Sequence, residues 1–284
     1  CFKCQEHGAE FGLFKEIGLL DFLKDGEFIQ QGPKIELENK LRTNKKRSKL
    51  ELDVPTQRPP LGYKRVSQDD YLDSRGFEPW QYEVYNCGKA RLVGKLKDYI
   101  IILVEEDGEN KGYLARHIWS KERIRAHKSD TGYDIARYRN EGGIDFSKLI
   151  FGIDEITEQT NIAILVEGGF DKFNVDKQLQ LNLDPNIVCL ATFGKKMSAE
   201  QIEKIRLKGI DTIFLMYDAD AVKESKEYSD ILKRNFKKIK VCYISPDSGK
   251  DPGDFDYEEL IGILKNAQSP VNFRSTKLQK RKLI

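Results

Sequence analysis

Long hydrophobic runs are absent from this 284-residue chain, and its longest apolar stretches, such as 99–104 and 162–166, are only strand-sized. A helix that crosses a membrane needs ~20 consecutive apolar residues, so the sequence predicts no transmembrane helix and no membrane partner. No charged and then apolar leader opens the chain, so we expect a cytoplasmic protein. The composition, 39% hydrophobic and 33% charged, is that of a water-soluble globular protein.

Cysteine is scarce, with five residues, of which Cys87, Cys189 and Cys242 stand alone among apolar neighbours. An odd number without paired spacing argues against a disulfide framework and favours a reducing compartment. The other two form Cys1-x-x-Cys4, a spacing that brings two thiolates to one tetrahedral zinc ion. Since zinc needs four ligands, the pair is predicted to be half of a zinc ribbon whose other half precedes it. The alternative is two ordinary thiols.

Basic and acidic residues nearly balance overall, since the net charge is only +2. The charges are unevenly distributed along the chain: residues 40–65 include nine Lys and Arg and only two acids, and residues 274–282 include five basic residues and no acid. Such blocks suit the phosphate backbone of a nucleic acid. The alternative is a solvated linker and tail.

Composition and periodicity divide the chain into five segments. These are a partial zinc ribbon with a helix (1–31), a basic and proline-rich linker (32–62), a mixed region (63–160), a region of regular alternation (161–266) and a basic tail (267–284). In the mixed region we expect a helix over 66–77 that ends at Gly76, strands at 81–85, 99–104 and 112–117, and a hairpin turn at Asp107-Gly108. The mixed region is therefore predicted to carry a small antiparallel sheet.

Four strand-sized apolar runs alternate with helical patterns from residue 161 onward. The runs are 162–166, 187–192, 212–217 and 240–244, and the helices are expected over 170–183, 198–207 and 221–236. Ser198 and Gln201 form a capping box at the second helix. This pattern indicates an α/β unit with a mostly parallel four-stranded sheet that is buried on both faces.

Acidic residues follow three of these four runs. Glu167 comes after the first, Asp218 and Asp220 after the third, and Asp251 lies in the loop after the fourth. Ligands of open parallel sheets bind beyond the carboxyl ends of the strands. Carboxylates that lie close together there repel one another, and a divalent cation such as Mg²⁺ that binds between them offsets this repulsion. Any one of these acids alone would be read as solvated or as a helix cap.

The second run is followed by Phe193-Gly194-Lys195-Lys196, directly before the capped helix. A helix N-terminus beside glycine and lysine favours an anion, so Lys195 and Lys196 are candidates for phosphate contacts. The alternative is a pair of surface lysines.

In these motifs the chain resembles the Toprim domain, the metal-binding fold shared by bacterial-type primases, topoisomerases and some nucleases. The resemblance rests on Glu167-Gly168, on Asp218-x-Asp220 and on Lys250-Asp251-Pro252. Upstream segments are similar to the basic region of bacterial and phage DNA primases, namely 112–117, Arg137-Tyr138-Arg139-Asn140 and 148–152. The likeness extends from Cys1 to about Leu264 and is greatest to the compact phage enzymes. The chain departs from the primase pattern at Val222-Lys223, where primases have Ala-Gly.

The resemblance implies an α+β basic subdomain followed by a Toprim domain, and a DNA primase that makes short RNA primers on single-stranded DNA from NTPs. It implies catalysis with Mg²⁺ or Mn²⁺ at Glu167, Asp218 and Asp220, supported by Asp171 and Asp251, and zinc at Cys1 and Cys4 only if the upstream half of the ribbon is present. A replicative helicase is the implied partner. The implied nucleotide- and DNA-binding residues are Arg116, Arg137, Arg139, Asn140, Lys148, Gly168, Lys195, Lys196 and Lys250.

Two other functions are compatible with the same residues. A Toprim-type nuclease uses acids and Mg²⁺ equally well, because hydrolysis of a phosphodiester needs the same charge neutralisation. A non-catalytic accessory protein that binds single-stranded DNA would gain nothing from the acids, which repel nucleic acid without a metal. A topoisomerase is disfavoured, because its nucleophilic tyrosine lies in a separate large domain, for which a chain of this length barely has room.

Overall fold

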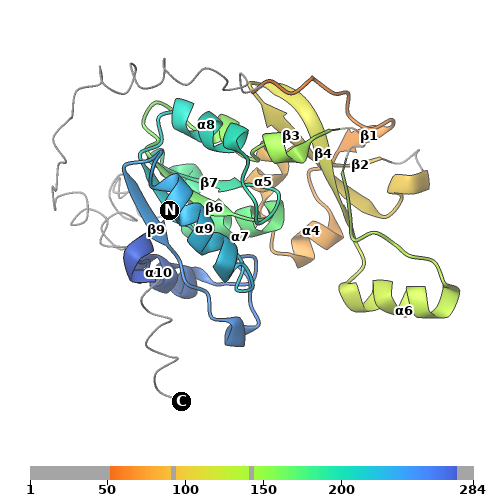
Figure 1. Ribbon diagram of the computed structural model, residues 1–284. Coiled ribbons are helices and arrows are strands. Elements are labelled where there is room, and N and C mark those ends of the chain that lie inside the picture. The colour runs from red at the N-terminus through yellow and green to blue at the C-terminus, as the bar shows by residue number, and fades with distance from the viewer. Residues whose placement is uncertain (1–51, 91–93, 141–143, 274–284) are drawn as a thin grey trace, which may run out of the picture.

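The computed structural model describes residues 52–90, 94–140 and 144–273, which form two units built on two sheets (Figure 1). The predicted zinc-ribbon segment with Cys1 and Cys4, most of the predicted linker and the tail beyond residue 273 lie outside the described residues. Within the described part of the chain, no helix combines the length and apolarity that a membrane span requires.

The first unit carries a five-stranded antiparallel sheet in the order β1-β2-β3-β4-β5. Its two long strands turn at Asp107 (φ 54°) and Gly108 (φ 72°), as the Asp-Gly pair predicts, because a tight hairpin turn needs two positive φ angles. The mixed α/β character of this region is therefore confirmed. The strands are β1 (Tyr63–Arg65), β2 (Cys87–Ala90), β3 (Tyr99–Glu106), β4 (Glu109–His117) and β5 (Tyr138–Asn140).

The helix expected over 66–77 is shorter, because Asp69 caps it late: the Asp69 side chain accepts from the backbone N–H groups of Tyr71 and Leu72. The turn after its end contains Gly76, whose φ of 75° suits glycine. The helices of this unit are α4 (Asp70–Ser74), α5 (Pro79–Val84) and α6 (Lys121–Thr131), with 3₁₀ turns η2 (Gly94–Leu96), η3 (Phe146–Lys148) and η4 (Ile153–Glu155).

The strand expected at 81–85 is wrong, since residues 81–84 belong to helix α5 and Tyr85 caps its end. Pro79 occupies the first helical turn and a capping box joins Glu78 to Gln81, both of which favour a helix start. Tyr82 and Tyr85, three residues apart, are both buried, which is the spacing of one helix face. Over so few residues, periodicity alone cannot distinguish a helix from a strand.

The second unit is the predicted parallel sheet, in the order β7-β6-β8-β9. The last strand starts and ends earlier than expected, although Cys242 and Ile244 beyond it stay buried. The capping box of Ser198 and Gln201 opens its helix as expected. The elements are β6 (Ile162–Val166), α7 (Gly169–Leu179), η5 (Leu181–Leu183), β7 (Ile187–Ala191), α8 (Ala199–Leu207), β8 (Thr212–Leu215), α9 (Val222–Leu232), β9 (Lys238–Val241), η6 (Pro246–Ser248) and α10 (Tyr257–Lys265).

One hydrophobic core is shared by the two units. Ile100, Ile102 and Val104 of β3 point into it from the first sheet, and Ile162 and Ile164 of β6 point into it from the second, together with residues of α7 and α10. The alternate residues of β6 and β8 face a separate core under α8 and α9, which explains why these strands read as continuous apolar runs. The predicted α/β fold class is confirmed.

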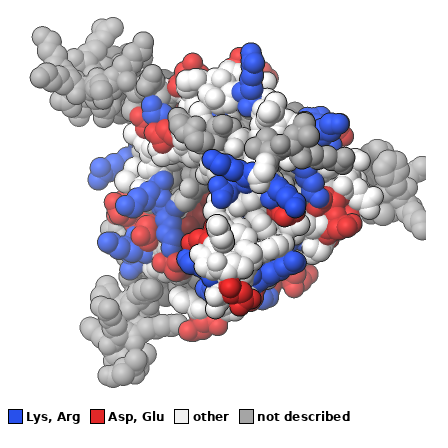
Figure 2. Space-filling view, turned by 90° about the vertical axis from the view of Figure 1, so that its right-hand side faces the viewer, with Lys and Arg blue, Asp and Glu red and all other residues white. Residues whose placement is uncertain are grey.

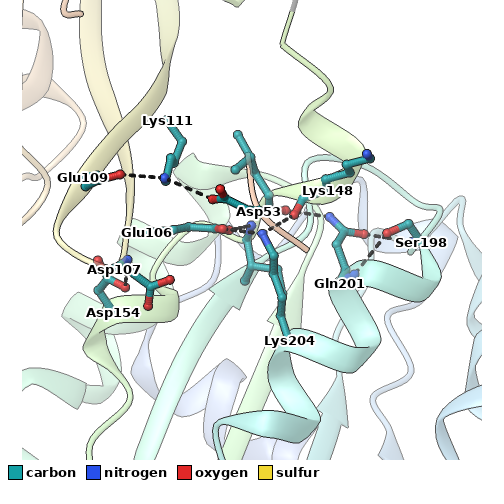
Figure 3. A network of polar contacts seen from close by, with 12 residues as sticks. Asp53, Glu106, Asp107, Glu109, Lys111, Lys148, Asp154, Ser198, Gln201 and Lys204 are labelled. Atoms are coloured by element: carbon teal, nitrogen blue, oxygen red, sulfur yellow. Dashed lines mark hydrogen bonds and ion pairs between the residues drawn. The ribbon is translucent and has the colours of Figure 1, made fainter. Parts of the chain in front are cut away.

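A polar contact also ties the units together at the start of α8 (Figure 3). The Lys204 ammonium pairs with Glu106 at the end of β3 and donates to the Lys148 carbonyl at 2.7 Å. Gln201 donates to the Leu149 carbonyl at 2.7 Å and to the Thr192 carbonyl at 2.9 Å. The backbone that links the two sheets is therefore held on both sides.

A buried lysine forms a second tie. The side chain of Lys172 on α7 is 0% exposed, and its Nζ lies 2.8 Å from Glu155 Oε2 and 2.6 Å from Asp176 Oδ2. The hydroxyl of Tyr85 on α5 also donates to Asp176. Helices from both units thus depend on the charge of one lysine.

We expect Lys172→Met to lower the free energy of unfolding by about 3–5 kcal/mol, because the buried carboxylate of Asp176 and the partly buried one of Glu155 would lose their cation. Urea unfolding monitored by circular dichroism measures the change. The matched control is Lys177→Met on the same helix, whose side chain is only partly buried. Equal and small losses in the two variants, below about 1 kcal/mol, would contradict the assigned role.

Candidate functional site

Three carboxylates meet at the carboxyl edge of the parallel sheet. Glu167 directly follows β6, and Asp218 and Asp220 follow β8, its neighbour in the sheet. One oxygen of each lies within 4.8 Å of the others. Parallel pairing therefore brings together residues that are 51 positions apart in the chain.

The set has the hydrogen bonding expected of a cation site. Glu167 Oε1 accepts from the Asp218 backbone N–H at 3.0 Å, which fixes one carboxylate against the next turn. Asp218 Oδ1 is buried without a hydrogen-bond partner, although a buried acceptor left unpaired is costly. Carboxylate oxygens are the ligands that Mg²⁺ and Mn²⁺ prefer. The residues present thus fit such an ion.

Burial and mutual repulsion raise the pKa of both inner acids. The pKa of Glu167 rises to about 7, chiefly through burial and then through the charge of Asp218. The pKa of Asp218 rises to about 6, through burial and then the charges of Asp251 and Asp220. A bound cation opposes both effects, since it favours the ionised form.

Two further acids lie behind this edge. Asp171 in the first turn of α7 accepts from the Gly168 backbone N–H at 3.0 Å, and burial together with Asp218 and Asp251 holds its pKa well above its usual range. Gly253 packs between Asp171 and Asp251: a Cβ there would lie 2.9 Å from one carboxylate and 3.0 Å from the other. The loop after β9 therefore needs glycine at this position to bring Asp251 close.

The acids line one wall of a cleft of about 300 Å³ between the two units. Glu167, Asp171, Asp218 and Asp251 come from the parallel-sheet unit, together with Gly168 and Phe170. The first unit lines the cleft with Arg75, Arg116, Arg137 and Tyr138. An acidic wall thus faces a wall of arginines, the pairing that binding of a metal-bound phosphate group requires.

Arg116 on β4 is the most firmly held of these cations. It is 5% exposed, and its Nε donates to the Tyr71 hydroxyl at 2.9 Å while Nη1 donates to the Tyr138 hydroxyl. Its guanidinium lies 4.7 Å from the centres of the Tyr138 and Phe170 rings. These contacts orient the charge before any ligand binds.

Several residues expected to bind nucleotide or DNA do not line the cleft. Arg139 follows Tyr138 on β5 and points to the other face, where its Nε donates to the Tyr99 hydroxyl at 3.0 Å. Asn140 is exposed at the end of that strand, and Lys148 lies in η3, where its carbonyl belongs to the contact at α8.

The three lysines at the parallel-sheet edge lie beside the cleft rather than in its lining. Lys195 pairs with Asp220, which places an ammonium next to the three acids. Lys196 is exposed before α8, and Lys250 pairs with Glu259 of α10. Of this group, Lys195 is the one that contacts a candidate metal ligand.

Three residues of the cleft were not among the sequence candidates: Arg75, Tyr138 and Phe170. Tyr138 and Phe170 stand inside motifs that the sequence singled out, but their contact with Arg116 depends on how the units pack. Arg75 follows a five-residue helix and precedes Gly76, a position with no charge pattern to mark it.

Comparison with known proteins supports the fold. No model of a protein family matches the chain, and no curated protein matches it. It is similar to the crystal structure of the Aquifex aeolicus primase (zinc binding and RNA polymerase domains), with a TM-score of 0.52 and 19% identity over 70% of this chain and 55% of that one. The likeness thus spans about half of the Aquifex chain and shows a shared fold.

A second similar chain belongs to a structure of bacteriophage T7 lagging-strand DNA polymerase interacting with primase domains of two gp4 subunits bound to an RNA/DNA hybrid and dTTP. The TM-score is 0.42, with 14% identity over 71% of this chain and 88% of that chain.

The raised pKa values predict how stability depends on pH. Because the folded protein holds the protons of Glu167 and Asp218 more tightly than the unfolded chain does, these two groups lower the stability of the metal-free protein as the pH rises from about 4 to 7. Mg²⁺ needs both groups ionised, so it should raise the melting temperature more at about pH 8 than at about pH 5.5. Scanning calorimetry with and without Mg²⁺ measures both trends. An Asp218→Asn variant should lose the Mg²⁺ effect, and an equal Mg²⁺ effect at both pH values would contradict the prediction.

Proposed function

We propose that this chain is a primase-type nucleotidyltransferase that synthesises short RNA primers on single-stranded DNA from NTPs. The observation that carries the proposal is the cleft in which Glu167, Asp218 and their neighbours face Arg75, Arg116 and Arg137. The primase-like fold supports the same reading. Nucleotidyl transfer needs positive charge on both sides of a triphosphate. In this cleft a metal ion held by the acidic wall would supply one of these charges, and the arginines of the opposite wall would supply the other.

Glu167, Asp218 and Asp220 would hold Mg²⁺ or Mn²⁺, with Asp171 and Asp251 as supporting acids. A bound divalent ion supplies charge neutralisation at the reacting phosphate. The unpartnered Asp218 Oδ1 and the raised pKa of Glu167 show that the chain alone does not neutralise this edge.

The arginine wall would bind and orient the triphosphate. As the 3′-hydroxyl of one nucleotide attacks the α-phosphate of the next, negative charge moves onto the departing pyrophosphate. Arg116 is already fixed by Tyr71, Tyr138 and Phe170, so it stabilises that charge without reorganising. Lys195 is placed to exchange Asp220 for a phosphate oxygen when the acids bind a metal.

The template would follow the side of the first unit that carries the five-stranded sheet and α6. Figure 2 shows Lys and Arg side chains in several groups on that side, interspersed with Asp and Glu side chains. Arg139, Asn140 and Lys148 are proposed to contact the phosphate backbone of the template outside the cleft. Lys196 and Lys250, which also lie outside the cleft, add positive charge from the parallel-sheet unit. The zinc ribbon, the five-segment division and the helicase partner stay predictions.

Asp218→Asn should lower primer synthesis by at least about 100-fold, because it removes a metal ligand without changing the side-chain volume. The assay incubates the protein with single-stranded DNA, Mg²⁺ and labelled NTPs and separates the oligoribonucleotides by size. Glu258→Gln, an exposed acid on α10, is the control and should keep full activity. Shortened DNA without new RNA would favour the nuclease, and full activity of Asp218→Asn would refute the proposal.

Arg116→Lys should lower kcat/KM for NTPs by about tenfold or more, because lysine cannot keep the forked contacts to both tyrosines. Mg²⁺ binding by the variant, measured by calorimetry, should be unchanged within a few-fold. The control is Arg206→Lys on α8, whose guanidinium pairs with Glu203 at 2.6 Å outside the cleft. The same loss in both variants would contradict a specific role of Arg116.

A further inference from the structure

The turn that follows β7 is tied to the first residue of the acidic edge. The Gly194 backbone N–H donates to the Glu167 carbonyl at 3.0 Å, and the Thr192 hydroxyl donates to the Gly194 carbonyl at 2.9 Å. Phe193, between them, has a φ of 58°, and its side chain packs against the core that the two units share. The backbone that leads into Lys195 is therefore fixed relative to a candidate metal ligand.

The Lys195 ammonium lies near all three acids. It pairs with Asp220, and its charge offsets part of the rise that burial causes in the pKa of Glu167 and of Asp218. The acids are not equivalent, because the Asp220 side chain is 75% exposed, whereas Asp218 Oδ1 is buried and has no hydrogen bond. Lys195 thus neutralises the outer end of the edge, and the unpaired oxygen lies at the inner end.

An ammonium on Asp220 competes with a metal ion. Sites that use two divalent ions for phosphate chemistry hold them ~3.5–4 Å apart, and oxygens of Glu167, Asp218 and Asp220 lie within 4.8 Å of one another. Because the Coulomb energy scales with the product of the charges, a divalent ion is repelled half as strongly by an ammonium as by a second divalent ion at the same distance. Lys195 therefore favours one bound ion, and a second ion must first displace the ammonium.

The contact between Lys195 and Asp220 is one that a ligand can exchange. An ion pair between exposed side chains adds little to stability, because water screens it and both side chains lose freedom. A triphosphate carries more negative charge than one carboxylate, and its oxygens are strong acceptors. A triphosphate in the cleft would thus draw the ammonium away and leave Asp220 open to a metal ion.

We propose that Lys195 acts as a tethered substitute for a second divalent ion. Without nucleotide, the edge binds one ion through Glu167 and Asp218 while the ammonium keeps Asp220. When a nucleoside triphosphate binds, Lys195 moves to a phosphate oxygen and Asp220 accepts the second ion. The inference rests on the proposed function, because it takes a triphosphate as the ligand of the cleft. It makes the two-ion form of the edge conditional on substrate.

Electron paramagnetic resonance of bound Mn²⁺ gives a direct test, because two ions ~3.5–4 Å apart couple magnetically. The wild type without nucleotide should bind one ion and give an uncoupled spectrum. Lys195→Met should lower the Kd of a second ion by at least about tenfold and give the coupled spectrum, because the competing charge is gone. Lys195→Arg keeps the charge, and Lys196→Met removes the same charge from an exposed neighbour, so both should bind Mn²⁺ as the wild type does. Circular dichroism confirms that each variant is folded.

A non-reactive NTP analogue tests the exchange. Added to the wild type it should produce the coupled spectrum, whereas Asp220→Asn should bind the first ion within a few-fold of the wild type and stay uncoupled with the analogue. A coupled pair in the wild type without nucleotide, equal Kd values for the second ion in the wild type and Lys195→Met, or an uncoupled wild type with the analogue would overturn the proposal. Loss of primer synthesis in Asp218→Asn is measured separately, so the proposed function can stand when this proposal fails.

Discussion

Repulsion between carboxylates is the constraint from which the site follows. Parallel pairing of β6 with β8 forces Glu167 and Asp218 to the same sheet edge, where burial strengthens their mutual repulsion. The described residues supply only partial relief, through Lys195 on Asp220 and a backbone N–H on Glu167. The fold holds this edge in place despite its cost, and a bound cation would relieve the repulsion that remains.

The other half of the chemistry comes from the antiparallel sheet. Arg116 reaches the cleft from β4 because it stands opposite Ile100, on the sheet face whose β3 residues pack into the core shared with β6 and α7. Its aromatic contacts come from both units, Tyr138 from the first and Phe170 from the second. Packing of the two units therefore completes the contacts that hold Arg116, whereas the acids of the opposite wall come from one unit.

The sequence was informative where function follows the end of a strand. Glu167, Asp218 and Asp220 stand directly after apolar runs, so the rule that parallel strands end at one sheet edge predicted their meeting. The sequence marked neither Arg75 as a residue of the cleft nor the direction in which Arg139 points, because the side of an element that meets the other unit depends on tertiary packing. Residues 81–85 were misassigned because one turn of an aromatic-rich helix has the composition of a strand. The acidic edge was thus readable from the sequence, and the resemblance named Arg116 and Arg137 of the facing wall, but Arg75 and the aromatic contacts of Arg116 were not foreseen.

Because the hydrophobic core of the two units is continuous, the width of the cleft between the acidic wall and the arginine wall is fixed when the chain folds. Opening it would expose side chains such as Phe151 and Phe173 to water. Any ligand of the cleft must then fit a space of nearly fixed width, and adjustment is left to side chains at the rim. Substitutions deep in the interior would therefore alter which ligands fit without touching any residue that lines the cleft.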